Sequence, residues 1–597
     1  MFKLVEKKHL SNLNIVLLVT LLFAIKLISI FGVILFLFLF LINSYLQSLN
    51  LKLTIFVIIG SFLYFYVDNQ LKLEMITILI YFFVLNQDTV INNKLYEKFI
   101  SFFNKLENKT FLFLLFLILV LTQNAYINYE TLDWDVNSYL LASQNIDLNN
   151  IPYETQWESK QPLFFYFYKF FILLSQGNLV NFKLLNDILI IFNVFFIYFL
   201  SLKELNNPLN SFIVSSFYLL MMSPAWATSE YSEIYSLLFI NLAVLLLFKN
   251  EIHLLDSIFL GIFFSFSVMI NIGTLVYLPI MLLKFKKNIF KSKYFIMIVL
   301  GFTLPLLLLI VLYFINGLEK ELFYTSFVIP LSYPSSSAFE INMLIDFLRG
   351  YFEFNLFLYI YIIFTIFNIL FFIRKINKQI IALLVLSLFF VILASHGYYH
   401  HFIFLIFYLS LGSYYQLKNH ESQISKIIFF VALISVLTPA SVKSIDNLSN
   451  YQTLQEDYPL YQVSNLIKNN SDTSKITVLA VDYHLVNFYL GLDNASYIVH
   501  PTNHNEDFIV DNLIEIGKIK DNELSRLVKV IKPDFILCSE NYSNFNCEVS
   551  DWVIYPDGKK VYKKVSLDEI NALTNIHFYK DPYKKIRLYE KTYQSTD

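Results

Sequence analysis

The chain has 597 residues, of which 57% are hydrophobic and only 15% are charged. Soluble domains usually carry about 25% charged residues, so this composition excludes an ordinary soluble enzyme. The formal net charge of −2 provides no field that would attract nucleic acid, and we expect no nucleic-acid partner. The sequence contains no Gly-rich phosphate-binding loop, which counts against an ATP-driven machine.

Long apolar runs recur through the first three quarters of the chain and predict an α-helical polytopic membrane protein with roughly 13–15 spans. We expect membrane lipids around these helices. The predicted spans are residues 13–27, 29–46, 53–68, 72–88, 111–127, 180–202, 209–223, 234–249, 255–271, 273–285, 294–316, 353–373, 379–395, 402–418 and 426–442.

The pattern divides the chain into three predicted domains. Residues 1–110 carry four extra N-terminal spans, residues 111–445 form the main membrane domain, and residues 446–597 form a soluble tail. The composition of the tail predicts an α/β domain of ordinary size. Residues 476–481 and 533–538 are the strand candidates. Between them, residues 521–531 have helical periodicity, with one apolar face made of Leu524, Leu527, Val528 and Ile531.

The placement of lysine predicts the orientation in the membrane. Three Lys-rich segments, 94–109, 284–293 and 374–378, are expected on the cytoplasmic side. Counting spans from any of them places the N-terminus inside, and it places the tail and four loops outside. These loops are residues 128–179, 224–233, 317–352 and 396–401. We therefore expect an integral protein of the inner or plasma membrane with a periplasmic or extracellular tail.

The chain has two cysteines, Cys538 and Cys547, and both belong to the predicted outer tail. They fit no zinc pattern. A disulfide between them is chemically allowed in an oxidising compartment, although their spacing does not decide whether it forms.

The first predicted outer loop carries three acids within six residues, namely Glu130, Asp133 and Asp135. In an extended segment Asp133 and Asp135 point to the same side. Like charges repel, so one of the two should have a raised pKa unless a cation or a metal lies nearby, and such a group can act as a general base. Glu130 and Asp133 are also possible metal ligands together with a histidine, so a divalent metal is a possible cofactor and none is certain. The plainer interpretation is a solvated acidic loop.

Residues Asp135 to Phe171 resemble the first outer loop of the GT-C membrane glycosyltransferases, which include the aminoarabinose transferases of lipid A and the protein O-mannosyltransferases. That loop has an acid, a Tyr four residues later, a Pro-Tyr turn, and an acid-x-Lys-Pro-Pro segment before an aromatic helix. The matching residues here are Asp135, Tyr139, Pro152, Tyr153, Glu158, Lys160, Pro162 and Tyr166. Gln161 replaces the first Pro of the pair. Asp-Trp-Asp replaces the usual acid pair, and the spacing to Tyr139 favours Asp135 as the functional acid.

Two further segments resemble the family more weakly. Residues 223–233 resemble the second outer loop, in which an acid, here Glu233, often begins the next span. Residues 395–401, with His396, His400 and His401, resemble a late outer His/Tyr motif. The Arg that usually precedes this motif is missing.

The resemblance implies a GT-C-like bundle that transfers a sugar, with inversion, from a polyprenyl-phosphate donor to a lipid, glycan or protein acceptor on the outer face of the membrane. It suggests Asp135, or alternatively Asp133, as the base. The candidates for contact with the donor phosphate are Lys160, His400 and Arg349, and the other candidate site residues are Glu130, Tyr139, Glu158, Glu233 and His401.

Each candidate also has a plainer interpretation. Lys160 and Arg349 are of a type that anchors helices at the membrane interface, and Glu233 suits a helix N-terminus. Three other functions remain open. An oligosaccharide ligase or polymerase would favour more outer arginines. A transporter predicts charges inside spans, for which Lys26 and Asp187 are the candidates. A non-catalytic scaffold predicts that changes in the acidic loop are harmless.

Overall fold

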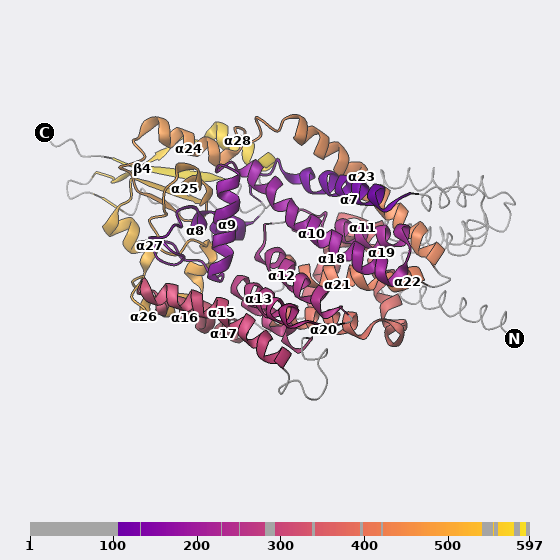
Figure 1. The fold of residues 1–597 in the computed structure, drawn as a ribbon. Helices are drawn as coiled ribbons and strands as arrows, with labels where there is room; N and C mark the ends of the chain where they lie inside the picture. The colour runs from indigo at the N-terminus through magenta and orange to yellow at the C-terminus, as the bar shows by residue number, and fades with distance from the viewer. Residues whose placement is uncertain are drawn as a thin grey trace, which may run out of the picture. The chain divides into compact units, whose positions relative to one another are not determined.

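The chain divides into two compact units, Met1–Leu106 and Glu107–Asp597. The computed structural model describes residues 106–131, 133–227, 230–249, 251–280, 293–336, 341–394, 398–418, 422–539, 553–554, 559–577 and 585–592. All that follows concerns the second unit (Figure 1). The four predicted spans between residues 13 and 88 lie outside the described residues, as do Lys26, His396, Cys547 and most of the segment 284–293.

Apolar helices form the membrane part of the second unit. Within the described residues, four helices are long and apolar enough to cross a bilayer: α7 with its 3₁₀ extension η1 (Asn108–Tyr126), α10 (Leu179–Leu205), α15 (Lys293–Ile315) and α23 (Ser422–Ser449). Six shorter apolar helices accompany them: α9 (Pro162–Leu174), α11 (Pro208–Met221), α12 (Ser232–Leu247), α13 (Leu254–Ile270), α19 (Leu356–Phe371) and α20 (Lys378–Leu393). The protein is an integral membrane protein.

Several predicted spans differ from the helices in the structure. Of the predicted span 273–285, the described part contains the 3₁₀ helix η2 (Ile272–Tyr277), because Asn271 ends α13 and its side chain accepts a hydrogen bond from the Gly273 amide. The predicted span 402–418 is divided into α21 (Ile403–Gly412) and α22 (Tyr414–Lys418). The predicted span 353–373 begins at a break between α18 (Ile341–Phe354) and α19. α9 lies inside the predicted outer loop 128–179, at the place where the family resemblance implies an aromatic helix.

Asparagine caps explain where several helices begin. The side chains of Asn178, Asn207 and Asn355 accept hydrogen bonds from backbone amides in the first turns of α10, α11 and α19. Asn206, at the end of α10, is in the left-handed conformation with φ 50°, which Asn tolerates better than most residues. Asn206 and Asn207 therefore form the two-residue turn between α10 and α11.

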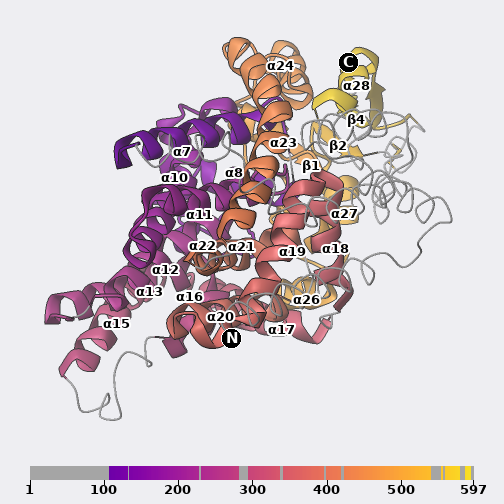
Figure 2. The ribbon, with the colours of Figure 1, turned by 90° about the vertical axis from the view of Figure 1, so that its right-hand side faces the viewer.

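Close helix contacts hold the bundle together. A Cβ atom built on Gly261 of α13 would lie 2.2 Å from the Ile298 carbonyl oxygen, and one on Gly301 of α15 would lie 2.2 Å from the Ile258 carbonyl oxygen. Only glycine permits this approach, which is typical of membrane helix pairs. On the other side, α23 runs beside α7 (Figure 2), and the Ser444 hydroxyl donates a hydrogen bond to the Val120 carbonyl.

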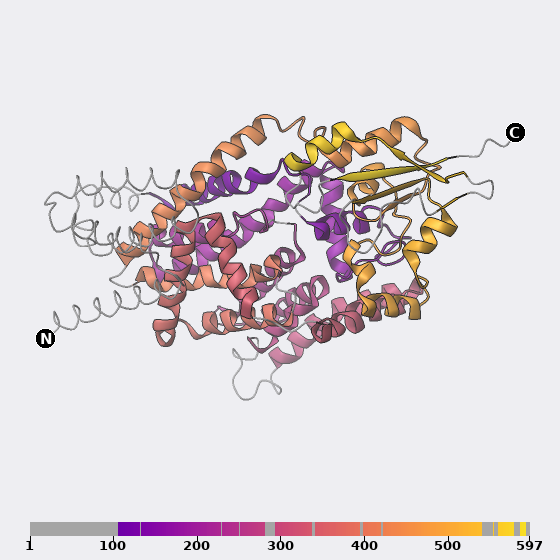
Figure 3. The same ribbon diagram turned by 180° about the vertical axis from the view of Figure 1, so that it is seen from behind.

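The tail contains a four-stranded sheet, which agrees with the predicted α/β domain. Its strands β1 (Val478–Ala480), β2 (Phe535–Ser539), β3 (Tyr562–Val565) and β4 (Ile586–Lys591) lie in the order β1-β2-β4-β3 (Figure 3). β1 and β2 are parallel, with Val478 opposite Phe535, and the other pairs are antiparallel. The helices of the tail are α24 (Pro459–Asn470), α25 (Leu485–Leu490), α26 (Asp507–Glu515), α27 (Glu523–Arg526) and α28 (Asp568–His577).

One apolar face of the tail was predicted incorrectly. α27 continues as a π-helix, η8 (Leu527–Ile531). Its wider turn shifts the side-chain positions relative to those of an α-helix. Leu527 and Val528 are buried, but 49% of Ile531 is exposed.

Cys538 lies fully buried in β2 and is disulfide-bonded. The only other cysteine of the chain lies outside the described residues.

The tail docks on the predicted outer loops through backbone and side-chain contacts. The Trp157 amide donates to the Tyr497 carbonyl at 2.7 Å, and the Val499 amide donates to the Trp157 carbonyl at 3.1 Å, as in a short parallel ladder. Lys518 forms a 2.9 Å ion pair with Glu321 of α16 (Glu319–Phe323). The loops 128–179 and 317–352 and the tail therefore lie on the same side of the bundle.

Candidate functional site

The site is organised by a short helix in the first predicted outer loop. α8 (Trp134–Gln144) begins after Asp133, whose backbone is extended, and Asp135 lies in its first turn. The helix start is positively polarised, so a carboxylate is favoured there. The Tyr231 hydroxyl donates to Asp133 Oδ2 at 3.1 Å. Asp133 and Asp135 therefore lie close together at a helix start and not along a strand.

Two histidines approach the Asp135 carboxylate from distant parts of the chain. His500 Nε2 lies 3.0 Å from Asp135 Oδ1, and His400 Nε2 lies 3.6 Å from Oδ2. His400 comes from the 3₁₀ helix η6 (Tyr399–Phe402), and His500 comes from the tail, immediately before η7 (Pro501–Asn505). The side chain of Asp135 is 21% exposed, so solvent still reaches it.

Aromatic rings hold His400 in place. Its ring stacks on Tyr231 with centroids 4.5 Å apart, and on Tyr398 with centroids 5.7 Å apart. The His401 ring packs edge-on against it at 4.4 Å. Because Tyr231 also binds Asp133, this stack joins the predicted outer loops 128–179, 224–233 and 396–401.

Lys160 is the cation of the site. Its Nζ lies 5.6 Å from the centroid of the Tyr139 ring. Burial lowers the pKa of Lys160, but the surrounding acids outweigh burial and leave the pKa raised. Lys160 therefore carries its charge in the site. The acids responsible are Glu233, Asp135, Glu158 and Asp133.

Asp135 has a lowered pKa. Burial raises the pKa of its carboxyl, but the hydrogen bond and charge of His500, followed by His400 and Lys160, outweigh burial. We expected one of Asp133 and Asp135 to have a raised pKa unless a cation lay nearby. Lys160 is such a cation for Asp135, so the lowered pKa agrees with that condition. The group is ionised at neutral pH.

Glu158 is the loop acid with a raised pKa. It is 2% exposed, and burial is the main cause of the shift. Its Oε1 accepts hydrogen bonds from the Ser159 amide and hydroxyl, both at 2.8 Å, while Oε2 has no hydrogen-bond partner in the structure. The neighbouring Tyr139 is fully buried against Phe164, and its hydroxyl also has no hydrogen-bond partner in the structure.

Glu130 lies in a different environment from the other two loop acids. Its carboxylate accepts hydrogen bonds from the Leu460 amide at 2.8 Å and the Tyr461 amide at 3.0 Å, at the start of α24. It therefore caps a helix of the tail.

Arg349 is also not brought to Asp135. Its side chain is 69% exposed and pairs with Glu353 at 2.9 Å within α18. Glu233 is buried in the first turn of α12, where its two oxygens accept from Asn271 Nδ2 at 3.1 Å and Ser232 Oγ at 3.2 Å. Its position suits both a helix start and the site, because it also lies beside the histidines of η6.

Two groups of described residues have ligand atoms close enough for a metal ion. They are Asp133, Asp135 and His400, and Glu233, His400 and His401; within each group the atoms lie within 4.8 Å of one another. A mixed carboxylate and imidazole set suits ions such as Mn²⁺ or Zn²⁺. These ligand atoms are of types that bind divalent cations. The charge of the site also fits a divalent cation, because four acids raise the pKa of a single lysine, Lys160.

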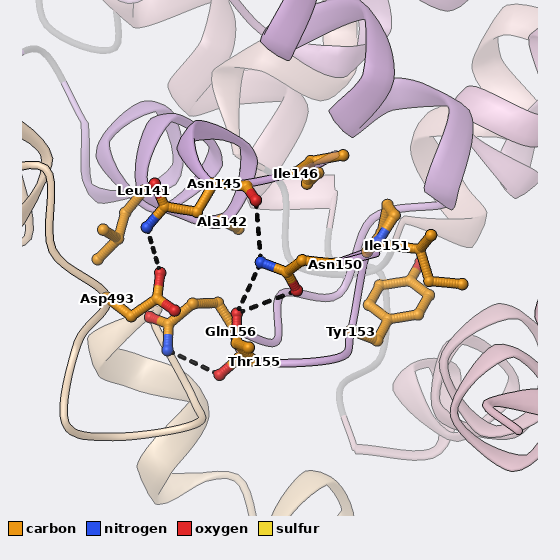
Figure 4. Close-up of a pocket in the computed structure, with 11 residues that line it drawn as sticks. Leu141, Ala142, Asn145, Ile146, Asn150, Ile151, Tyr153, Thr155, Gln156 and Asp493 are labelled. Carbon is orange, nitrogen blue, oxygen red and sulfur yellow. Dashed lines mark hydrogen bonds between the residues drawn. The ribbon is translucent and has the colours of Figure 1, made fainter. Parts of the chain in front are cut away.

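A small polar pocket lies at the far end of α8 (Figure 4). Asn145 Nδ2 donates to Asp493 Oδ1 at 2.7 Å, and Asn150 Nδ2 donates to the Asn145 carbonyl at 2.9 Å. Gln156 and Thr155 complete the wall. These polar groups bond mainly to one another, so the pocket joins the loop to the tail and does not extend the site around Asp135.

Sequence reasoning missed His500 and Tyr231. Tyr231 stood in a segment recognised for its acids, and it contacts both Asp133 and His400. His500 stands in the tail, where no motif marks it. The pairing of Trp157 with residues 497–499 helps to bring His500 to Asp135.

The helical bundle carries helix α8, with acidic residues at its start, in a loop on which a small α/β tail docks. This arrangement is a GT-C-like membrane fold. Among solved structures, it is similar to ArnT from Cupriavidus metallidurans, an aminoarabinose transferase, in a crystal structure bound to undecaprenyl phosphate. The TM-score is 0.51 at 10% sequence identity, over 71% of this chain and 92% of that one. The apo structure of the same protein gives a TM-score of 0.43 at 10% identity, over 70% and 91%. No protein-family model and no curated protein matches the sequence.

Proposed function

We propose that the protein is an inverting membrane glycosyltransferase that moves a sugar from a polyprenyl-phosphate donor to a lipid, glycan or protein acceptor. The observation that carries this proposal is that Asp135 lies in the first turn of α8 while Lys160 Nζ lies 5.6 Å from the ring of Tyr139 in the same helix, near enough for the two charges to stabilise each other, within a GT-C fold. The similar ArnT structure holds undecaprenyl phosphate, which supports a lipid-phosphate donor here.

The two residues match the two requirements of the reaction. An acceptor oxygen attacks the anomeric carbon, the bond from that carbon to the phosphate oxygen breaks, and the acceptor proton passes to the Asp135 carboxylate. A carboxylate with a lowered pKa is a weak base, so it suits a reaction in which the sugar–phosphate bond breaks ahead of proton transfer. Asp133 lies beside it as the alternative base.

The leaving phosphate gains negative charge as the bond breaks, and it needs a preorganised cation. We assign this role to Lys160, with His400 as a second contact. Arg349 receives no role in this scheme, because its guanidinium group pairs with Glu353 and faces solvent.

We also propose that a divalent cation binds among Glu233, His400 and His401, so that His400 would reach the donor phosphate through the cation and Asp135 would stay free to act as the base. Without it, a phosphate would enter a site in which four acids surround one lysine. The cation would neutralise charge on the donor phosphate. Loss of sugar transfer in a chelator, with recovery on adding Mn²⁺ or Mg²⁺, is the expected result, whereas full activity in the chelator would contradict this part of the proposal.

The same side of the bundle carries α8, η6 and the tail, and the Lys-rich segments predict that this side faces outward. We propose that the site faces the periplasm or the cell exterior. A cysteine-labelling reagent that cannot cross membranes would then reach a cysteine placed at the exposed Leu148 in intact cells. Protection of that cysteine until the cells are opened would reverse the orientation.

The experiment that tests the function compares wild type with Asp135→Asn. Both proteins are purified and supplied with a panel of polyprenyl-phosphate sugars and a membrane extract as acceptor, and sugar transfer is followed. We expect transfer to fall by about 10²–10⁴-fold in Asp135→Asn, with donor binding retained. The matched control is Glu154→Gln, which changes an exposed acid of the same loop and should keep full activity.

Each other outcome of that experiment has a definite meaning. Unchanged transfer in Asp135→Asn would move the base to Asp133. If the wild-type protein consumes no donor of any sugar, the glycosyltransferase proposal fails. The transporter alternative is not favoured by α10, because Lys183 and Asp187 lie in the first third of that helix and not at its middle.

A further inference from the structure

We propose that His500 is a positioning residue for Asp135, so that sugar transfer depends on a side chain supplied by the tail. This inference rests on the proposed function. The juxtaposition that carries it is direct: His500 Nε2 lies 3.0 Å from Asp135 Oδ1, and the histidine side chain is only 10% exposed.

The second ring nitrogen of His500 determines how the histidine acts. His500 Nδ1 accepts a hydrogen bond from the Thr502 amide at 3.3 Å and lies 2.9 Å from Thr502 Oγ1. Since a backbone N–H points at Nδ1, the ring proton belongs on Nε2, which therefore donates to Asp135. Both nitrogens are engaged, so His500 has no free lone pair with which to take a proton from an acceptor.

The backbone before His500 fixes the position of the ring. Residues 497–499 pair with Trp157 through two main-chain hydrogen bonds of 2.7 and 3.1 Å. The edge of the Trp134 ring packs against the imidazole with centroids 6.4 Å apart. Trp157 also directly precedes Glu158 and lies three residues before Lys160. One backbone bridge therefore positions the tail histidine and the loop carrying the cation at the same time.

The hydrogen bond leaves the two oxygens of Asp135 with different environments. Oδ1 is held by His500, whereas Oδ2 lies 3.6 Å from His400 and remains the oxygen available to an acceptor. Loss of the His500 donor frees the carboxylate to rotate. Because small errors in the placement of a reacting group cost about 10²-fold in rate, we expect a loss of that order.

The test compares two substitutions of the same residue in the full-length protein. His500→Phe keeps a flat ring but removes the donor, and we expect kcat to fall about 10²-fold with little change in KM for the donor. His500→Gln restores an N–H at similar reach and should recover at least a tenth of the wild-type kcat. The matched control is His504→Gln in the adjoining 3₁₀ helix η7. The His504 ring lies 3.4 Å from Ser496 Oγ, and the variant should keep the wild-type kcat.

The outcomes separate this inference from the proposed function. If wild type transfers sugar and Asp135→Asn does not, but His500→Phe keeps full kcat, then the positioning role is wrong and the function stands. If His500→Phe, His500→Gln and His504→Gln all lose activity together with their melting temperatures, then the histidine is only structural, and the inference also fails. Support requires recovery in His500→Gln, together with no further loss when His500→Phe is added to Asp135→Asn.

Discussion

Glu130 and Asp135 come from one acidic stretch, yet the tail gives them opposite environments. Glu130 receives two amide hydrogen bonds from the start of α24, and burial raises the pKa of its carboxyl to about 8. Asp135 receives His500, and its pKa is lowered even though it too loses solvent. The comparison teaches that the partner offered by the tail, and not the position in the loop, decides which acid is structural and which belongs to the site.

The largest expected effect in this comparison concerns Lys160, which belongs to the Asp135 side. Lys160→Met removes the cation that we assign to the donor phosphate, and we expect kcat/KM to fall by about 10²–10³-fold. The measurement is steady-state sugar transfer with a polyprenyl-phosphate sugar. The control is Lys169→Met, because the Lys169 ammonium donates to the Gln144 carbonyl at the end of α8 away from Asp135. Equal losses of kcat/KM in the two variants would show that the effect does not depend on the place of Lys160 in the site.

Glu130→Ala tests the structural side. It leaves the buried Leu460 amide and its neighbour without acceptors, and each orphaned group costs about 1–3 kcal/mol. We expect a clearly lower melting temperature, measured in detergent, with the kcat of the folded fraction within a few-fold of wild type. A thermally stable but inactive Glu130→Ala protein would place Glu130 in the chemistry and break the comparison.

Glu130 and Asp135 should change the stability of the protein with pH in opposite directions, because the pKa of Glu130 is raised and that of Asp135 is lowered. Burial raises the folded-state pKa of Glu130 to about 8 from an ordinary value of 4.5, so the folded chain binds the proton more tightly than the unfolded chain. Its contribution to stability is complete below about pH 4.5 and is lost as the pH rises through about 8. We expect the melting temperature of wild type to fall over this range, and to fall less in Glu130→Gln. A steeper fall in Glu130→Gln would contradict the assignment.

The smallest effect should come from Arg349. Its ion pair with Glu353 is exposed on both sides, and such pairs contribute about 0–1 kcal/mol. We expect Arg349→Ala to keep both sugar transfer and the melting temperature close to wild type. A large rise in KM for the donor would instead show that α18 closes over the phosphate during the reaction.

Local pattern was enough to predict some features. The apolar runs located most of the described helices, residues 476–481 contain β1, and residues 533–538 contain all of β2 except its last residue, Ser539. Asp135 and Lys160 became candidates because the outer loop resembles that of a known family, and in the structure each acts on the charge of the other, while their roles stay predictions.

Other features depend on contacts between distant parts of the chain, which a single sequence does not display. His500 reaches Asp135 because the tail docks on the loop, and the main-chain pairing of Trp157 with the tail is part of that docking. Glu130 was counted among the candidate site residues and metal ligands because its helix partner, α24, belongs to the distant tail. Ile531 was misplaced because nothing local distinguished a π-turn from the α-helix that its periodicity indicated.

The bridge between Trp157 and residues 497–499 also orders events in time. Asp135 is synthesised and inserted long before His500 leaves the ribosome, an interval on the order of tens of seconds at usual translation rates. Under the proposed roles, the growing chain already displays its acid and its lysine but does not yet hold the acid in a working orientation. The protein would then become competent only when its last domain has folded, so a truncated or stalled chain would occupy the membrane without consuming the lipid-linked sugar of the cell.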